Sequence, residues 1–281
     1  MVREVRRLGD VRKDKLPLVA DRVDEIRGLL EGRRMAVFLD YDGTLTPIAS
    51  RPEEAFLSQE MWAAVRRLSW LCPVAIISGR DRERLKEFVG LDGVYYAGSH
   101  GLDIEGPEGS GLRNDVGSEF GGVIQRFAAR MEGDVLGVPG VLVERTAYTA
   151  AVHYRLAPRE RVREVEAAVD RALLEFPTLR KTHGKMVFEV RPQLDWDKGT
   201  AVMWLLEALG LGGEGTVPIY IGDDVTDEDA FRAISEQGVG VLVSEGVRET
   251  SARYMLRDTA EARWFLGWLA DELEAGAAAE R

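Results

Sequence analysis

The stretch that most constrains this chain is a short apolar run that ends in two closely spaced acids. Residues 35–39 (Met-Ala-Val-Phe-Leu) predict a buried strand, and Asp40 and Asp42 follow it directly. Side chains two residues apart on a strand point the same way, so both carboxylates can share one side of the strand end. Gly43 allows a sharp turn there. Open α/β sheets bind ligands at the carboxyl ends of parallel strands, so the stretch indicates a functional site, although an Asp-Gly turn after any strand would look similar.

Strands and helices alternate in the residues that follow. Ser58 can cap a helix with one apolar face, and Pro73 ends that helix. Buried strands are expected over residues 74–77 and 94–97, with a helix over residues 81–89 between them. Strand, helix, strand, helix, strand is typical of a doubly wound parallel sheet, so the expected fold class is α/β.

The pattern changes after Gly-Pro-Glu-Gly-Ser-Gly at residues 106–111, which marks a hinge or an exposed turn. Two helical and four strand-like segments follow, and they predict a small α+β unit with two helices over a four-stranded antiparallel sheet. The earlier alternation returns near residue 198. We therefore expect a second domain inserted in the first, with a catalytic core of residues 1–106 and 193–281 and a cap of residues 107–192.

Composition argues against several kinds of partner. The 281 residues carry a formal charge of −11, and nucleic acid requires a basic face. No apolar run approaches the roughly 18 residues that span a membrane. Cys72 is the single cysteine, which rules out an intrachain disulfide and fits a reducing compartment. The expectation is a cytoplasmic monomer that binds neither membrane nor nucleic acid.

Two further polar groups stand where helices begin. Ser78, in Ser-Gly-Arg, lies between a strand and a helix, where a hydroxyl beside free backbone N–H groups favours phosphate. Plain turn chemistry explains Ser78 equally well. Lys198 opens a helix, where the dipole disfavours a cation by about 0.3–1 kcal/mol, so a bound phosphate would account for it. A solvated lysine is the alternative.

An acidic cluster follows another buried strand. Five acids fall within residues 223–229, directly after Tyr-Ile-Gly, and oxygen ligands in that number suit a hard cation. The last three acids could instead cap a helix and favour its dipole. Asp223 and Asp224 come too early for that role, and Asp223 is the favoured metal ligand.

Taken in order, these segments resemble the four motifs of the haloacid dehalogenase superfamily, which is mostly phosphatases acting through an aspartyl-phosphate. The insertion falls between the second and third motifs, as in members with the larger kind of cap. Over about residues 34–245 the amino-acid sequence is similar to that of the trehalose-6-phosphate phosphatases. One departure is Arg145-Thr146, where these relatives often carry a lysine nearby. The segments that carry the likeness are FLDYDGTLTPI (38–48), ISGR (77–80), AGSHGLDI (97–104), Glu144 with HYR (153–155), GKMVFEVRP (184–192) and YIGDDVTDEDAF (220–231).

The resemblance implies an α/β haloacid dehalogenase-like core that binds Mg²⁺. A phosphate ester repels an anionic nucleophile, so the site must first cancel charge. The resemblance assigns Mg²⁺ to the Asp40 carboxylate, the Asp42 main-chain carbonyl and Asp223, with Asp224 and Asp227 behind these ligands.

The same resemblance assigns catalytic roles. Asp40 would attack phosphorus, and Asp42 would protonate the departing sugar oxygen and later activate water. Ser78 and Lys198 would bind the transferring phosphoryl oxygens. Asp227 would orient Lys198 or a metal-bound water.

The inserted unit is expected to choose the sugar. In the strands at residues 148–155 and 185–191, polar and charged side chains alternate with apolar ones, so one face packs on helices and the other can bind hydroxyl groups. A solvent-facing surface explains the same alternation, and the family resemblance favours sugar contact. The candidate substrate-binding residues are Arg80, His100, His153, Arg155, Lys185, Glu189 and Arg191.

The expected function is a Mg²⁺-dependent release of phosphate from a small sugar phosphate, with trehalose 6-phosphate as the favoured substrate. The nearest alternative is another glycosyl phosphate, such as sucrose phosphate or a mannosyl- or glucosyl-phosphoglycerate. A non-catalytic domain that binds the sugar phosphate is a further alternative, but every motif residue is intact. A trehalose-6-phosphate synthase is the macromolecular partner that the resemblance suggests.

Overall fold

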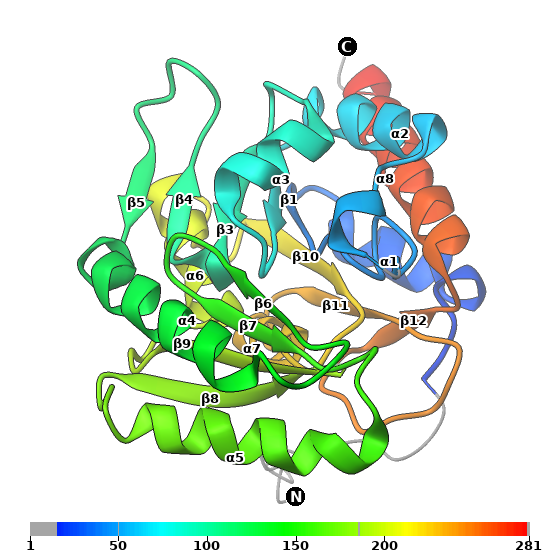
Figure 1. The fold of residues 1–281 in the computed structure, drawn as a ribbon. Helices are drawn as coiled ribbons and strands as arrows, with labels where there is room; N and C mark the ends of the chain where they lie inside the picture. The colour runs from blue at the N-terminus through cyan, green and yellow to red at the C-terminus, as the bar shows by residue number, and fades with distance from the viewer. Residues whose placement is uncertain (1–15, 50, 185, 280–281) are drawn as a thin grey trace, which may run out of the picture.

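Two sheets organise the structure, a computed structural model that describes residues 16–49, 51–184 and 186–279 (Figure 1). The strands of the larger sheet are β1 (Arg34–Leu39), β2 (Val74–Ile77), β3 (Tyr95–Gly98), β4 (Asp103–Glu105), β5 (Arg113–Asp115), β10 (Thr216–Gly222), β11 (Val239–Val243) and β12 (Tyr254–Leu256). Their order is β12-β11-β10-β1-β2-β3-β4-β5. The pairs from β12 to β3 are parallel, and β4 and β5 are added antiparallel. The predicted doubly wound α/β core is confirmed.

Helices cover both faces of this sheet. One face packs against α1 (Val23–Leu30), α2 (Gln59–Ser69), α3 (Arg82–Val89) and α8 (Thr259–Ala279), and the other against α6 (Lys198–Ala208) and α7 (Asp227–Ala233). Short 3-10 turns occur at η1 (Val19–Asp21), η2 (Pro52–Glu54), η3 (Ser99–Gly101), η4 (Ser118–Phe120) and η5 (Arg159–Arg161). None of the helices in the described ranges has the length and apolar content needed to cross a bilayer.

The central strand β1 divides the core between these two helical layers. Val37 and Leu39 pack with α1, α2, α3 and α8, while Ala36 and Phe38 pack with α6 and α7. Both faces are buried, which explains why the run is apolar without alternation. Asp40 continues the Ala36–Phe38 series and therefore faces α6.

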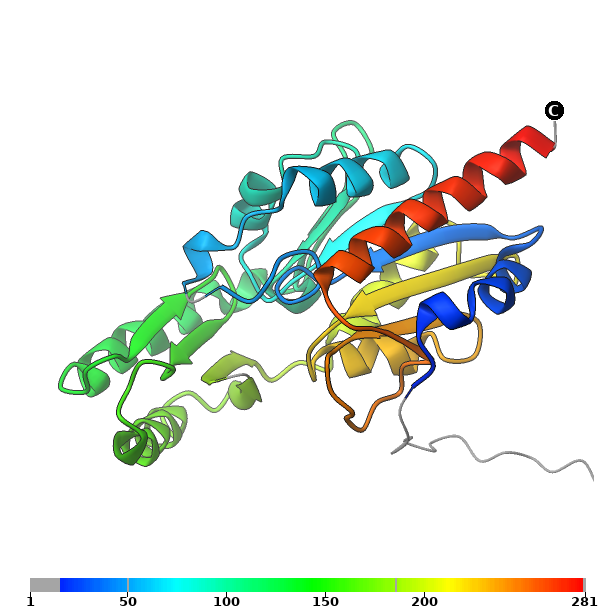
Figure 2. The ribbon, with the colours of Figure 1, turned by 90° about the vertical axis from the view of Figure 1, so that its right-hand side faces the viewer.

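The smaller sheet forms a second lobe, coloured green in Figure 2. Its strands are β6 (Leu142–Arg145), β7 (Ala150–His153), β8 (Leu179–Gly184) and β9 (Val187–Pro192), all antiparallel in the order β6-β7-β9-β8. The helices α4 (Gly121–Val135) and α5 (Val162–Leu173) cover one face of it. Phe127, Val169 and Phe188 are buried between the helices and the strands. The predicted inserted α+β unit has this arrangement.

The hairpin of β4 and β5 is the part of the fold that the sequence does not indicate. The glycine-rich segment at residues 106–111 is the turn of this hairpin, and both strands belong to the larger sheet. The expected boundary at residue 107 therefore falls inside the hairpin, and α4 is the first long element that packs with the smaller sheet. Short strands of mostly charged residues carry no hydrophobic alternation, which is why they read as a linker.

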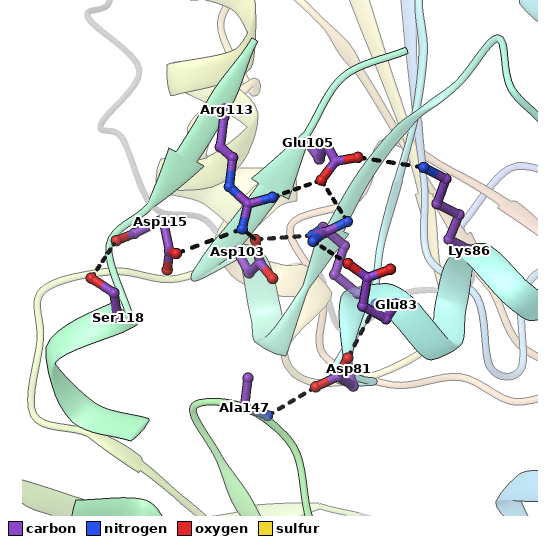
Figure 3. Close-up of polar contacts among 10 residues, drawn as sticks. Asp81, Glu83, Lys86, Asp103, Glu105, Arg113, Asp115, Ser118 and Ala147 are labelled. Carbon is purple, nitrogen blue, oxygen red and sulfur yellow. Dashed lines mark hydrogen bonds and ion pairs between the residues drawn. The ribbon is translucent and has the colours of Figure 1, made fainter. Parts of the chain in front are cut away.

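Ion pairs hold this hairpin against α3 (Figure 3). Arg82 on α3 is 4% exposed and contacts Asp103 at 3.0 Å and Glu105 at 2.8 Å, one on either end of β4. Arg113 on β5 contacts Glu105 at 2.6 Å from the solvent side. Burial raises the pKa of Asp103, and the two arginines act in the opposite direction. The buried guanidinium of Arg82 is thus what allows an acidic strand to join the sheet.

We predict that Arg82→Met destabilises the protein far more than Arg113→Met. Removing the buried cation leaves Asp103 without its main partner, at a cost of about 3 kcal/mol, whereas the half-exposed Arg113 pair is worth at most about 1 kcal/mol. Urea unfolding of both variants measures the difference. Equal losses would show that the hairpin does not depend on the buried pair.

Candidate active site

Asp40 lies at the carboxyl end of β1, in the middle of the larger sheet. Its N–H donates to the carbonyl of Ile221 on β10 at 2.9 Å, which keeps the two strand ends level. Asp40 is 5% exposed, and its Oδ1 accepts a hydrogen bond from Lys198 Nζ at 2.6 Å. The side-chain alternation of the strand therefore brings this acid to the start of α6.

Lys198 is buried, which excludes the solvated lysine that the sequence left open. It is 2% exposed and opens α6 directly after Asp197, whose side chain caps the helix by accepting from the N–H of Thr200 at 2.8 Å. Besides Asp40, Nζ reaches Oδ1 of Asp227 at 2.7 Å. Two carboxylates thus hold a cation where the helix dipole alone disfavours one.

Asp227 supports the lysine from the opposite side. It is fully buried at the first position of α7, and it also accepts from the Tyr220 hydroxyl at 2.7 Å and from the N–H of Asp224 at 2.8 Å. Its carboxylate is therefore directed at Lys198 as well as at the start of its own helix. The sequence analysis did not predict a role for Tyr220, because a tyrosine in an apolar strand is usually a core residue. Its hydroxyl group was the one feature that could have indicated a polar role.

Asp223 reaches the site across a glycine. Gly43 has a φ of +88°, and its N–H donates to the carbonyl of Thr46 at 2.7 Å, which closes the tight turn after Asp42. A Cβ at this position would lie 2.2 Å from Oδ2 of Asp223. The absence of a side chain at Gly43 is thus what lets the loop after β10 approach the loop after β1.

The electrostatics of the cluster fit a divalent cation. Carboxylate oxygens of Asp40, Asp223 and Asp227 lie within 4.8 Å of one another, and these three carboxylates and one ammonium leave an excess of two negative charges when all are ionised. Oδ2 of Asp40 is buried and has no hydrogen-bond partner among the described residues. Both oxygens of Asp227 already accept hydrogen bonds, so Asp40 and Asp223 are the better ligands for a hard cation.

Burial and the neighbouring charges also shift the pKa values of Asp40 and Lys198. Burial raises the pKa of Asp40, with Lys198 opposing the shift and the neighbouring acids adding to it. Burial alone would lower the pKa of Lys198, but Asp227 and Asp40 outweigh burial and raise it. The ammonium therefore stays charged, and a further positive charge nearby would favour the ionised form of Asp40.

Ser78 and Arg80 follow β2 and face the same space. The Ser78 hydroxyl accepts a hydrogen bond from the N–H of Arg80 at 3.2 Å. The Arg80 guanidinium makes two hydrogen bonds of 2.6 Å to the carboxylate of Asp42 and lies over the rings of Tyr41 and Phe88. Arg80 thereby fixes the position of the second acid in the Asp-x-Asp pair.

The smaller lobe supplies the other wall of a cavity of about 370 Å³ above these groups. Glu189 on β9 lies 3.1 Å from Nε2 of His100, and Glu144 on β6 lies 2.9 Å from Nε2 of His153. Burial opposes the charged form of Glu189, but His100 and Arg191 outweigh it and lower its pKa to about 2. The hydrogen bond from His153 lowers the pKa of Glu144. Two carboxylates therefore face the cavity from the cap.

Most candidate residues come together around this cavity. Arg191 does not line it; this residue pairs across β8 and β9 with Arg180, and burial and that neighbour lower its pKa. Asp227 lies beneath Lys198, and Lys185 lies outside the described residues. The candidates that line the cavity are Asp40, Asp42, Ser78, Arg80, His100, His153, Arg155, Glu189, Lys198, Asp223 and Asp224.

Sequence reasoning also missed contacts that join the two lobes. The Ser99 hydroxyl lies 2.9 Å from that of Thr146, Asp81 accepts from the N–H of Ala147 at 2.9 Å, and Arg155 donates to the carbonyl of Ala49 at 3.1 Å. Single serine, threonine and aspartate residues at strand and helix ends read as ordinary turn and cap residues. Only the positions of the two lobes reveal them as contacts between the core and the cap.

A doubly wound sheet with buried acids and a lysine at its carboxyl edge, below a second α+β lobe, defines a haloacid dehalogenase-like fold. Among solved structures, one described as a trehalose-6-phosphate phosphatase related protein has a TM-score of 0.74 and 27% identity, over 84% of this chain and 97% of that one.

Sequence comparisons identify the family within this fold class. The sequence model of the trehalose-phosphatase family matches residues 38–260. The trehalose 6-phosphate phosphatase RA3 of Zea mays is 41% identical over 92% of this chain and 76% of its own, and the trehalose-phosphate phosphatase of Mycobacterium avium (strain 104) is 43% identical over 96% and 71%. The chain belongs to the trehalose-phosphatase family and is a phosphoric monoester hydrolase.

We predict that Gly43→Ala lowers phosphatase activity at least tenfold, because the added methyl group displaces Asp223 from Asp40. Gly109→Ala is the matched control. Gly109 has a similar φ of +80°, but no atom lies within 4 Å of the added Cβ.

Each substitution should reduce the free energy of unfolding by about 1–2 kcal/mol, because each forces a side chain into the left-handed region. Urea unfolding of both variants measures the cost of the backbone strain. Phosphate release from both variants measures the effect of the collision with Asp223. Equal activity in the two variants would contradict this account of Gly43.

Proposed function

We propose that this chain hydrolyses trehalose 6-phosphate to trehalose and phosphate, with Mg²⁺ as cofactor and an aspartyl-phosphate at Asp40. The observation that supports it best is the buried pairing of Asp40 with Lys198 at the floor of a cavity whose other wall is polar. The family and the names of the relatives support the substrate. The size of the cavity lies in the range usual for small-molecule sites.

In this proposal Asp40, Asp223 and the main-chain carbonyl of Asp42 hold Mg²⁺, which supplies charge neutralisation for the incoming phosphate when bound. Lys198 and Ser78 then bind phosphoryl oxygens, and these contacts strengthen as negative charge spreads in the transition state. Asp227 keeps the ammonium of Lys198 beside the nucleophile.

The covalent step uses the Asp-x-Asp pair. Asp40 attacks phosphorus and forms a mixed anhydride, while the bond to the sugar oxygen breaks and Asp42 protonates that oxygen. Water then attacks the anhydride, and Asp42 takes its proton, which restores Asp40 and releases phosphate. Arg80 occupies both oxygens of Asp42 here, so protonation of the sugar requires Asp42 to turn from Arg80 toward the substrate.

The sugar lies against the cap in this proposal. Glu189, Glu144 and His153 present acceptors and donors from strands whose opposite faces are packed in the cap core. A disaccharide has hydroxyl groups to pair with these half-buried polar groups, and a substrate that lacks them leaves the groups unsatisfied. The pairing therefore favours a glycosyl phosphate over a small alkyl or aryl phosphate.

The substrate is tested by phosphate release from a panel of trehalose 6-phosphate, sucrose 6-phosphate, glucosyl-phosphoglycerate and p-nitrophenyl phosphate, with Mg²⁺ and with chelator. We expect the highest kcat/KM on trehalose 6-phosphate and loss of turnover with chelator that added Mg²⁺ restores. Equal turnover across the panel would remove the trehalose assignment. Binding without turnover of any member would favour a regulatory sugar-phosphate-binding domain.

The nucleophile is tested by Asp40→Asn, which preserves size but removes the attacking charge. We expect a loss of at least about a thousandfold in kcat, as when other enzymes lose a nucleophile. Mass spectrometry after acid quenching should detect a phosphorylated enzyme for the wild type and none for Asp40→Asn. Asp42→Asn with p-nitrophenyl phosphate is the control, because that leaving group departs without protonation and the variant should still accumulate the phosphorylated form. Turnover that survives loss of the Asp40 carboxylate would contradict the mechanism.

A further inference from the structure

The turn that follows β3 holds two adjacent non-glycine residues in the left-handed region. Ser99 and His100 have φ values of +50° and +59°, which side chains rarely adopt, and Gly101 follows at +91°. The turn is tightly enclosed, because a Cβ at Gly98 would lie 2.3 Å from the backbone of Arg82. Two adjacent residues in the left-handed region persist only where surrounding contacts determine the conformation.

The backbone of this turn holds the loop that carries Ser78. The N–H of His100 donates to the carbonyl of Ser78 at 2.8 Å, and the N–H of Ser99 donates to the carbonyl of Arg80 at 2.7 Å. The ring of His100 packs over Gly79, where a Cβ would come within 3.0 Å of it. The position of the phosphate-binding hydroxyl therefore depends on the conformation of residues 99–100.

The same turn also contacts the helix of Lys198. A Cβ at Gly101 would lie 2.3 Å from Cβ of Ala201, and the indole N–H of Trp196 donates to the carbonyl of Gly101 at 2.9 Å. The turn thus packs against the loop of Ser78 on one side and against α6 on the other. These are the two elements that supply the phosphoryl contacts.

The side chains of the turn reach in the other direction, to the cap. The Ser99 hydroxyl lies 2.9 Å from that of Thr146, which itself accepts from the N–H of Thr149 at 2.9 Å. The His100 ring pairs with Glu189 at 3.1 Å. Two neighbouring residues therefore bind the phosphate-binding loop with their backbone, and their side chains bind the β6–β7 turn and β9 of the cap.

We propose that Ser99 and His100 form a coupler, in which contact with the cap holds the strained turn and the strained turn holds the Ser78 loop in its phosphate-binding geometry. Ser99 is a positioning residue in this scheme, since it acts on phosphate through Ser78. The core is then competent for phosphate only when the cap is seated, which favours substrates large enough to engage both lobes. The inference rests on the proposed function for the role of Ser78.

The test uses variants that break the hydroxyl contact between the lobes. Ser99→Ala loses the contact but still places a side chain on a backbone with positive φ. Thr146→Val loses the contact from the cap side. Ser99→Gly loses the contact and also relieves the backbone strain. The probe is inorganic phosphate with Mg²⁺, measured by calorimetry on the full chain, because phosphate is too small to reach the cap. The second readout is kcat on p-nitrophenyl phosphate.

We expect Ser99→Ala and Thr146→Val each to weaken phosphate binding about three- to tenfold, the size of effect that one neutral hydrogen bond supplies. The double variant should bind phosphate as tightly as Thr146→Val alone, because Ser99→Ala removes a contact that Thr146→Val has already broken. Ser99→Gly should stay within about twofold of the wild type, because a glycine holds the turn without help from the cap.

The control is Asp81→Asn, which removes a different cap contact. Asp81 accepts from the N–H of Ala147 and caps α3 (Figure 3), and an asparagine still caps the helix. This variant should bind phosphate as the wild type does. Unchanged phosphate affinity in Ser99→Ala, additive effects in the double variant, or equal losses in Ser99→Gly and Ser99→Ala would each overturn the coupler. Wild-type protein that binds phosphate but leaves trehalose 6-phosphate intact would overturn the proposed substrate alone.

Discussion

The buried ammonium of Lys198 is the interaction on which the rest of this site depends. It neutralises part of the charge of two carboxylates that otherwise repel each other in a region of low dielectric. The sheet brings these groups together, since β1 supplies Asp40, and β10 supplies Tyr220, which binds Asp227. The two strands pair directly, so the acids meet without any long side chain having to reach across the sheet. Even so, three carboxylates face one ammonium in this cluster, an arrangement that suits a divalent cation.

The sequence predicts most of the core because its signals are local. The apolar run before Asp40, the cap at Ser58 and the order of the polar loops are readable from short windows, and the structure confirms the doubly wound sheet. The hairpin of β4 and β5 was not predictable in this way, because its stability comes from Arg82, which lies in an earlier helix. A strand that joins a sheet through ion pairs with another element has no signature of its own in the chain.

The candidate site shows the same division. Asp40, Asp42, Ser78 and Asp223 follow strands and Lys198 opens a helix, so residue type and spacing suffice to predict where they lie. The contacts between the lobes are different, since Ser99 and Thr146 belong to separate folding units and meet only when both units are in place. Residues of this kind are ordinary turn residues in the sequence and acquire their meaning from tertiary structure. Arg191 was predicted from the alternation of polar and apolar residues along β9. The structure pairs it with Arg180 on β8, and it does not line the cavity.

The pairing of β1 with β10 has a consequence for how the protein is made. Asp40 is synthesised before the cap, but the strand that hydrogen-bonds beside it ends at residues 221–222, after the whole cap. The cap is contiguous in sequence and its strand pairs are short-range, so it can fold on the ribosome while β1 still lacks a neighbour on one side. The core closes a much longer loop, which slows its assembly. A nascent chain therefore carries a folded cap and an open, apolar central strand at the same time, and that interval is when the growing polypeptide most needs protection from aggregation.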